Sequence, residues 1–124
     1  MKKIFKLLPL ILMLGLFLSP NLISAKQSQV YTGDALVVNG GGIFLGIVVA
    51  TDGTNSVTID IYDNIESGGG RLIIPWVVTT SASNRSQALG FSKEDDVTFK
   101  SGIYVDVTTS GTVSYQVIYL PKGQ

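Results

Sequence analysis

The feature that most constrains this fold is the alternation of apolar and polar residues in three short segments. Residues 57–62 place β-branched side chains on one face of an extended chain and polar or aromatic ones on the other, namely Val57, Ile59 and Ile61 against Thr58, Asp60 and Tyr62. Residues 103–107 and 113–119 repeat the pattern, with Ile118 as an interruption. A period of two is typical of a strand that buries one face, so all three segments are predicted to be half-buried β-strands.

Residues that favour helices are scarce after position 25. This part of the chain holds only two glutamates, few alanines or leucines, and 13 of the 14 glycines. Three further runs, at residues 35–38, 43–50 and 72–79, are almost continuously apolar, which is typical of strands that are covered on both faces or lie near a bend. Pro75 has no N–H group for a sheet ladder, so its run is predicted to be an edge strand or to break there.

Turn signals separate the apolar runs, and they include glycine triplets at residues 40–42 and 68–70. Neither triplet continues as a phosphate-binding loop would, so both are predicted to be ordinary loops. Short strands at this spacing predict an all-β fold, an antiparallel β-sandwich of about seven to eight strands with jelly-roll or Ig-like topology. Residues 26–124 suffice for a single such domain. Its predicted core consists of Leu45, Ile47, Val49, Val57, Ile59, Ile61, Ile73, Trp76, Phe91, Ile103, Val105, Val107, Val113, Tyr115 and Val117.

Residues 1–25 have the pattern of a secretory signal peptide. Three lysines precede an apolar run at residues 7–18, and Ser24 and Ala25 provide a small-residue cleavage site. The run is about half the roughly 20 residues that a membrane span needs. We therefore predict a signal-peptide helix that is cleaved after Ala25, with a retained N-terminal anchor as the alternative. The expected product has no membrane span and is periplasmic, extracellular or attached to a surface.

The composition excludes several kinds of chemistry. The chain has no Cys and no His, so it can form neither a Ser-His-Asp nor a Cys-His nucleophile pair, nor a thiolate or imidazole metal site. Without residues 1–25, which include three lysines, 6 of the 9 cationic and all 9 acidic side chains remain, a net charge of −3. Such a balance provides no basic face for phosphates, so we expect no nucleic-acid partner.

Tyr62, Tyr104 and Asp60 are the candidate binding residues. Aromatic rings at the polar positions of a strand can stack on sugars or fill a protein interface. The alternative is a cross-strand pair that only covers the sheet. Asp60 and Asp63 also have the residue types of a glycosidase acid–base pair, but Asp63 and Asn64 are better explained as a turn in which short side chains accept backbone N–H bonds. We therefore expect no enzymatic activity.

Residues 94–96 form the dense acidic cluster of the sequence. Glu94, Asp95 and Asp96 could supply oxygen ligands to Ca²⁺ together with nearby carbonyl groups. Their spacing is not that of an EF-hand, and three adjacent acids reach one ion only through a tight turn. The alternative is a solvated loop that precedes the next strand. Calcium is therefore the only cofactor that the sequence suggests.

Several segments together resemble a known group, the small β-sandwich structural proteins of tailed phages and prophages. They are residues 57–64, 67–68, 72–74, 99–105 and 117–121. In that group a strand ending in an aromatic-Asp pair, a glycine turn, a Ser-Gly-Ile-Tyr-Val strand and a closing aromatic strand recur. The resemblance implies a virion-associated or other structural, non-enzymatic role, and it transfers no functional residue. The signal peptide departs from the group, since virion proteins assemble in the cytoplasm, and it points to an exported relative.

The sequence thus leads to two functional hypotheses. The first is an exported, non-catalytic structural protein that acts by contact with itself or with a protein partner. For this role residues 112–120 are the candidate edge strand, since a free sheet edge can accept another strand. The alternative is a carbohydrate- or Ca²⁺-binding β-sandwich module that uses the tyrosines and acids above.

Overall fold

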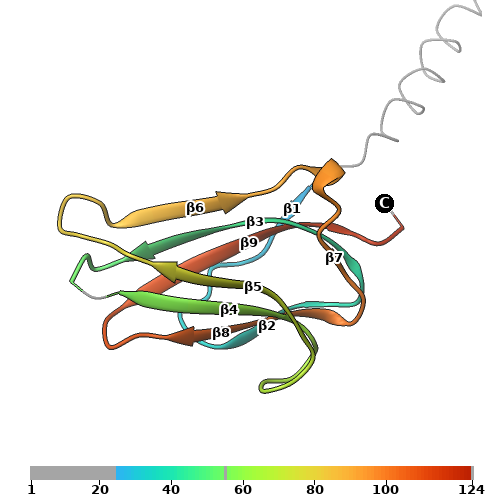
Figure 1. Cartoon of the computed structure of the whole chain (residues 1–124), viewed down its shortest axis with the longest axis horizontal. Helices are drawn as coiled ribbons and strands as arrows, with labels where there is room; N and C mark the ends of the chain where they lie inside the picture. Colours follow the sequence, from blue (N-terminus) through green and yellow to red (C-terminus); the bar gives the residue numbers. More distant parts are fainter. Residues whose placement is uncertain (1–24, 55, 124) are drawn as a thin grey trace, which may run out of the picture.

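The computed structural model describes residues 25–54 and 56–123, and these form two β-sheets (Figure 1). The predicted signal peptide lies outside the described residues except for Ala25. Within these described ranges nine strands are formed, two of them only two residues long: β1 (Lys26–Gln27), β2 (Ala35–Asn39), β3 (Gly42–Thr51), β4 (Val57–Asp63), β5 (Arg71–Val78), β6 (Ser86–Gly90), β7 (Thr98–Phe99), β8 (Gly102–Thr108) and β9 (Val113–Pro121). A 3₁₀ turn, η2 (Lys93–Asp95), precedes β7.

Each sheet is antiparallel throughout. The first has the order β1-β9-β3-β6, with β7 also paired to the start of β3, and the second has the order β2-β8-β4-β5. This arrangement confirms the predicted all-β fold of two antiparallel sheets. No helix in the described part of the chain is both long enough and apolar enough to cross a membrane.

The core lies between the sheets and follows the predicted alternation. Val57, Ile59 and Ile61 of β4 are fully buried, and Ile103 and Val105 of β8 lie beside them. The first sheet contributes alternate residues of β3 and β9 in the same way. Burial of a side chain of this size stabilises the fold by about 1.5–3 kcal/mol, so this core supports the fold without a disulfide.

Two β-bulges explain two of the errors in the predicted core, at Leu45 and Ile73. The register of β3 shifts between Phe44 and Gly46, so Phe44 is buried and Leu45 is not part of the core. A second shift, opposite Ile61 and Tyr62, leaves Ile73 only partly buried while Ile74 faces inward. Trp76, Phe91 and Val107, also predicted as core, pack against it but stay partly exposed.

The prediction that residues 112–120 form a free edge is wrong. Strand β9 pairs with β3 along its length and with β1 on its other side. The chain after β1 extends this cover, because Ser28 N–H donates to Val117 O (2.8 Å) and Tyr31 exchanges two backbone hydrogen bonds of 2.9 Å with Tyr115. The two tyrosine rings also stack, with centroids 5.8 Å apart.

The edge strands of the second sheet are β2 and β5, as its strand order shows. Pro75 lies within β5, so the prediction of an edge strand at Pro75 is confirmed. Strand β6, an edge of the first sheet, escapes the sequence analysis because Ser-Gln-Ala-Leu-Gly contains no β-branched residue.

Candidate functional site

The outer face of the second sheet carries side chains that lie in rows across its strands. We call this surface the tyrosine face, and define it by Leu36, Thr58, Asp60, Tyr62, Leu72, Pro75, Val77, Tyr104, Asp106 and Thr108. These residues alternate with the inward-facing core residues of β2, β8, β4 and β5. The period of two that buries the core therefore also builds this surface.

The first row is apolar and aromatic and spans all four strands. Tyr62 lies directly opposite Tyr104, Tyr104 opposite Leu36, and Tyr62 opposite Leu72 on the edge strand. Leu72 is 43% exposed, and both tyrosines are half-buried. Because neighbouring strands are about 4.8 Å apart, the row extends for about 14 Å. It is a flat apolar strip on the surface of the sheet.

The second row is acidic and lies two residues further along the strands. Asp60 is opposite Asp106 on one side and Pro75 on the other. Asp34 joins this group from the segment before β2, where its carboxylate accepts a hydrogen bond from Val107 N–H (2.7 Å). Burial of Asp106, together with the negative charges of Asp34 and Asp60, raises the pKa of Asp106 above 3.8. The row is thus a crowded set of carboxyl oxygens beside the rings.

The structure brings together the three predicted binding residues, Tyr62, Tyr104 and Asp60. The sequence reasoning missed Asp106 and Asp34. One signal was available for Asp106: Asp60-Ile61-Tyr62 and Tyr104-Val105-Asp106 are mirror images, and antiparallel pairing places such segments with like residues opposite. Asp34 offers no comparable signal, because it reaches the sheet through the conformation of a loop.

Asp63, at the end of β4, is not part of the tyrosine face, and its carboxylate binds backbone N–H groups. Its carboxylate accepts hydrogen bonds from the N–H groups of Lys100 (2.9 Å), Ser101 (2.8 Å) and Gly102 (3.4 Å), and it lies 3.6 Å from the exposed guanidinium of Arg71. Burial acts to raise the pKa of Asp63, but these amides and the Arg71 charge outweigh it and lower the pKa below 3.8. Asp63 therefore holds the turn before β8 against the end of β4.

The hydrogen bonds of Asp63 argue against the acid–base pair of Asp60 and Asp63 that the sequence suggested. Asp60 lies in the acidic row of the tyrosine face, whereas Asp63 is committed to the backbone of residues 100–102. Asn64 behaves as the turn residue that was predicted, since its side chain bonds Ile65 N–H and Glu66 O, both at 2.9 Å. The geometry of Asp60 and Asp63 thus offers no support for glycoside hydrolysis.

The three acids predicted as calcium ligands lie at η2 and just after it. The Asp95 carboxylate accepts bonds from Ser92 N–H (2.8 Å) and Ser92 Oγ (3.2 Å), and so caps the turn that contains Glu94. Asp96 adopts a left-handed conformation with φ 55°. Among the residues that the structure describes, no group of three acidic side chains is arranged to hold a metal ion. The calcium site stays a prediction from the sequence.

The outer face of the first sheet differs in kind. We call it the small-residue face, and define it by Gly46, Val48, Ala50, Ser86, Ala88, Gly90, Ser114, Gln116 and Ile118. These positions are paired across β9, β3 and β6, and none of them carries a charge. A shallow hollow of about 110 Å³ lies between this face and Val30. The molecule thus has two flat outer surfaces of unlike chemistry.

Comparisons with known proteins do not assign this chain to a group. No protein-family model and no curated protein matches it. The resemblance to phage structural proteins remains a prediction from the sequence.

Proposed function

We propose that this chain is an exported, non-catalytic binding protein whose tyrosine face binds a polysaccharide. The observation that carries the proposal is the register of β8 with β4, which sets Tyr104 against Tyr62 and Asp106 against Asp60. A row of rings offers flat apolar area to the faces of sugar rings. The adjacent carboxylates accept charge-assisted hydrogen bonds from sugar hydroxyl groups.

The role of Asp63 supports a function without catalysis. The Asp63 carboxylate, which is the nearest to Asp60 along the strand, is occupied by backbone hydrogen bonds. The chain has no His or Cys that could act as an acid or base in its place. Asp106 lies opposite Asp60 on the flat face of the sheet. This arrangement suits hydrogen-bond acceptors for a ligand better than it suits a closed acid–base pair.

The topology is compatible with such a role. With the short β7 set aside, the chain passes between sheets with the orders β1-β9-β3-β6 and β2-β8-β4-β5, which we interpret as the double Greek key of a jelly roll. Jelly rolls occur in lectins and in viral capsids. Since a fold does not define a function, the proposal rests on the tyrosine face.

Export is supported by the signal-peptide pattern of residues 1–25. Expression of the full chain in a secreting bacterial host should yield a product that begins at Lys26. Intact-mass measurement of the periplasmic and medium fractions tests this. A product that retains residues 1–25 would contradict the cleavage and favour the anchor.

Binding is tested with a glycan array, followed by affinity gel electrophoresis on the best polysaccharide. We expect Tyr62→Ala and Tyr104→Ala each to weaken binding about tenfold or more, because a stacked ring contributes about 0.5–1.5 kcal/mol beyond the area it buries. Val48→Ala, on the small-residue face and 41% exposed in the wild type, is the control and should bind normally. Circular dichroism shows that each variant is folded. Absence of any glycan that binds, or equal binding by the tyrosine variants, would overturn the proposal.

A second candidate is assembly of copies of this chain through the small-residue face. The absence of charge on that face favours it, because charged groups oppose the close packing of two sheets. Ala88→Lys should then convert an oligomer into a monomer, as measured by size-exclusion chromatography with light scattering. Thr58→Lys, on the tyrosine face, is the matched control. A wild-type chain that is monomeric at high concentration would remove this candidate.

A further inference from the structure

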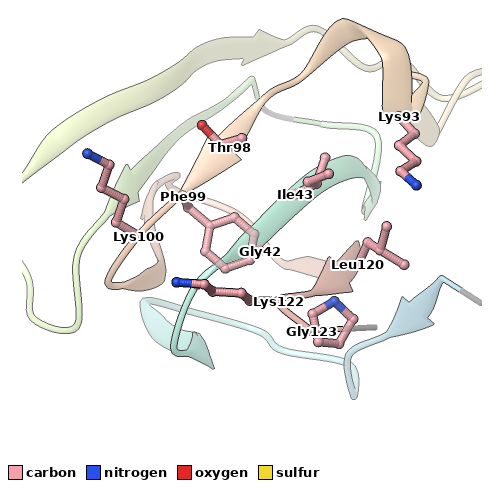
Figure 2. A pocket seen from close by; sticks show the side chains of 11 residues that line it. Gly42, Ile43, Lys93, Thr98, Phe99, Lys100, Leu120, Lys122 and Gly123 are labelled. Carbon is pink, nitrogen blue, oxygen red and sulfur yellow. The ribbon is translucent and has the colours of Figure 1, made fainter. Parts of the chain in front are cut away.

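A pocket of about 580 Å³ lies at one end of the sandwich, away from both outer faces that are discussed above. Strands β3, β7 and β9, the turn η2 and the loop residues Gly41, Lys100, Lys122 and Gly123 provide its lining (Figure 2). Its volume falls within the range of about 300–1,000 Å³ that is usual for small-molecule sites. The pocket is large enough for an organic ligand of modest size.

The centre of the pocket is apolar. Ile43, Phe99 and Leu120 line it, and Phe99 and Leu120 are 2% and 6% exposed. Gly42 permits this arrangement, because a Cβ atom there would lie 2.8 Å from Cζ of Phe99 and would also meet the carbonyl oxygen of Leu120. The predicted loop at residues 40–42 is thus a loop only in part, since Gly42 begins β3 and forms a wall of the pocket.

The pocket is surrounded by positive charge. Lys93, Lys100 and Lys122 line it, and they are three of the six cationic residues between positions 26 and 123. No lining residue is acidic, although the chain beyond residue 25 is acidic overall. Figure 2 shows Lys93 and Lys122 on different sides of the apolar centre. Half of the cationic residues in this range therefore belong to the lining of the pocket.

Within residues 25–54 and 56–123, Arg71 and Asp63 form an ion pair, and these three lysines form none. A cationic side chain is stabilised by a nearby negative charge, and no described residue supplies one to these three lysines in an ion pair. A ligand with a negative charge would therefore complement them. The apolar centre requires that this ligand also have an apolar part.

We propose that this pocket binds a small amphipathic carboxylate, a medium-chain fatty acid in its ionised form. The acyl chain lies against Ile43, Phe99 and Leu120, and the carboxylate lies between the ammonium groups of Lys93 and Lys122. This site is independent of the tyrosine face, and it gives the glycines at residues 41 and 42 a role in ligand binding as well as in folding.

The test is a calorimetric titration of the purified full chain with sodium octanoate below its micellar concentration. Three further probes separate the possible sources of binding: acetate has the charge without the chain, 1-octanol has the chain without the charge, and vesicles with an anionic lipid present the same chemistry as a membrane surface. The Lys93→Gln/Lys122→Gln double variant removes the two charges, and Lys26→Gln is the matched control outside the pocket. Amide NMR spectra with octanoate locate the site.

We expect saturable binding of one octanoate per chain, with acetate and 1-octanol at least tenfold weaker. The double variant should bind octanoate about three- to tenfold more weakly, which is the effect of removing two partly exposed charge contacts. Lys26→Gln should bind as the wild type does. Higher salt should weaken octanoate binding. Amide shifts should be largest at Gly41, Gly42 and Thr98.

Three results would overturn the proposal. The first is octanoate binding that does not saturate or that equals 1-octanol binding. The second is binding that the double variant retains in full while its spectrum shows a folded protein. The third is binding to anionic vesicles alone, which would assign the lysines to a membrane surface.

Discussion

The two outer faces of this sandwich are built by the same alternation of residues, yet they differ in almost every chemical property. The tyrosine face carries rings and crowded carboxyl groups, whereas the small-residue face carries Gly, Ala, Ser and a few uncharged larger side chains. Both lie over antiparallel strands that bury their other side in one core. The core positions thus explain the fold, while the outward positions, which the fold leaves free, are where the proposed binding function would be encoded.

Substitution of Asp63 and of Asp60 tests whether the acids of the tyrosine face differ from an acid that holds the fold, and we expect it to change stability more than the substitutions below. Asp63→Ala should lower the free energy of unfolding by about 3 kcal/mol, because it leaves three backbone N–H groups without their charged acceptor. Asp60→Ala, on the same strand, should change it by less than about 0.5 kcal/mol. Urea unfolding followed by circular dichroism measures both. Equal effects of the two substitutions on the free energy of unfolding would contradict the claim that Asp63, unlike Asp60, stabilises the fold.

An intermediate effect concerns the sheet beneath the small-residue face. The Tyr115 hydroxyl donates a 2.6 Å hydrogen bond to Gly33 O and so fastens the segment that covers β9. Tyr115→Phe should lower the free energy of unfolding by about 1 kcal/mol. It should leave the oligomeric state unchanged, since β9 stays paired with β1 and β3. New oligomers of Tyr115→Phe in light scattering would show that β9 can act as an edge after all.

A smaller effect on stability is expected from the repulsion between Asp106 and its neighbours Asp34 and Asp60. Since the folded state raises the pKa of Asp106 above 3.8, it holds this proton more tightly than the unfolded chain does. Stability should therefore fall as the pH rises from about 4 through the raised pKa. Asp106→Asn should remove that slope and increase the free energy of unfolding at pH 7 by less than about 1 kcal/mol.

Asp63 should show the opposite sign, because its pKa is lowered in the folded state and its contribution is lost as the pH falls below about 3.8. Urea unfolding of the wild type and of Asp106→Asn between pH 3 and pH 7 separates the two groups. Ser114→Ala on the small-residue face is the control and should leave the pH profile unchanged. An Asp106→Asn profile identical to that of the wild type would contradict the crowding of the acidic row.

Local patterns predicted much of the fold and part of the site. The alternation at residues 57–62 and 103–107 identified both strands and the outward position of Tyr62, Tyr104 and Asp60, because a period of two is a property of the extended chain itself. The bulges that displace Leu45 and Ile73 were not predicted, since they depend on the partner strand and not on the residues of the bulged strand alone.

The remaining errors also come from contacts between distant segments. Strand β9 looks like an edge because nothing near it in sequence covers it, and its cover is supplied by β1 and Tyr31, more than 80 positions earlier. The pocket at the end of the sandwich brings together residues 93, 100 and 122 with Gly42, which only the pairing of β3 with β7 and β9 makes neighbours. The period of hydrophobic residues does not predict such sites, because it does not determine which strands pair.

Mapping where a bound polysaccharide touches the protein tests the proposed role of the tyrosine face. Amide NMR spectra of the full chain, titrated with the best glycan from the array, should show their largest shifts at Asp60, Tyr62, Tyr104 and Asp106. Shifts confined to Val48, Ala88 and Gln116 on the small-residue face, with none on the tyrosine face, would contradict the account.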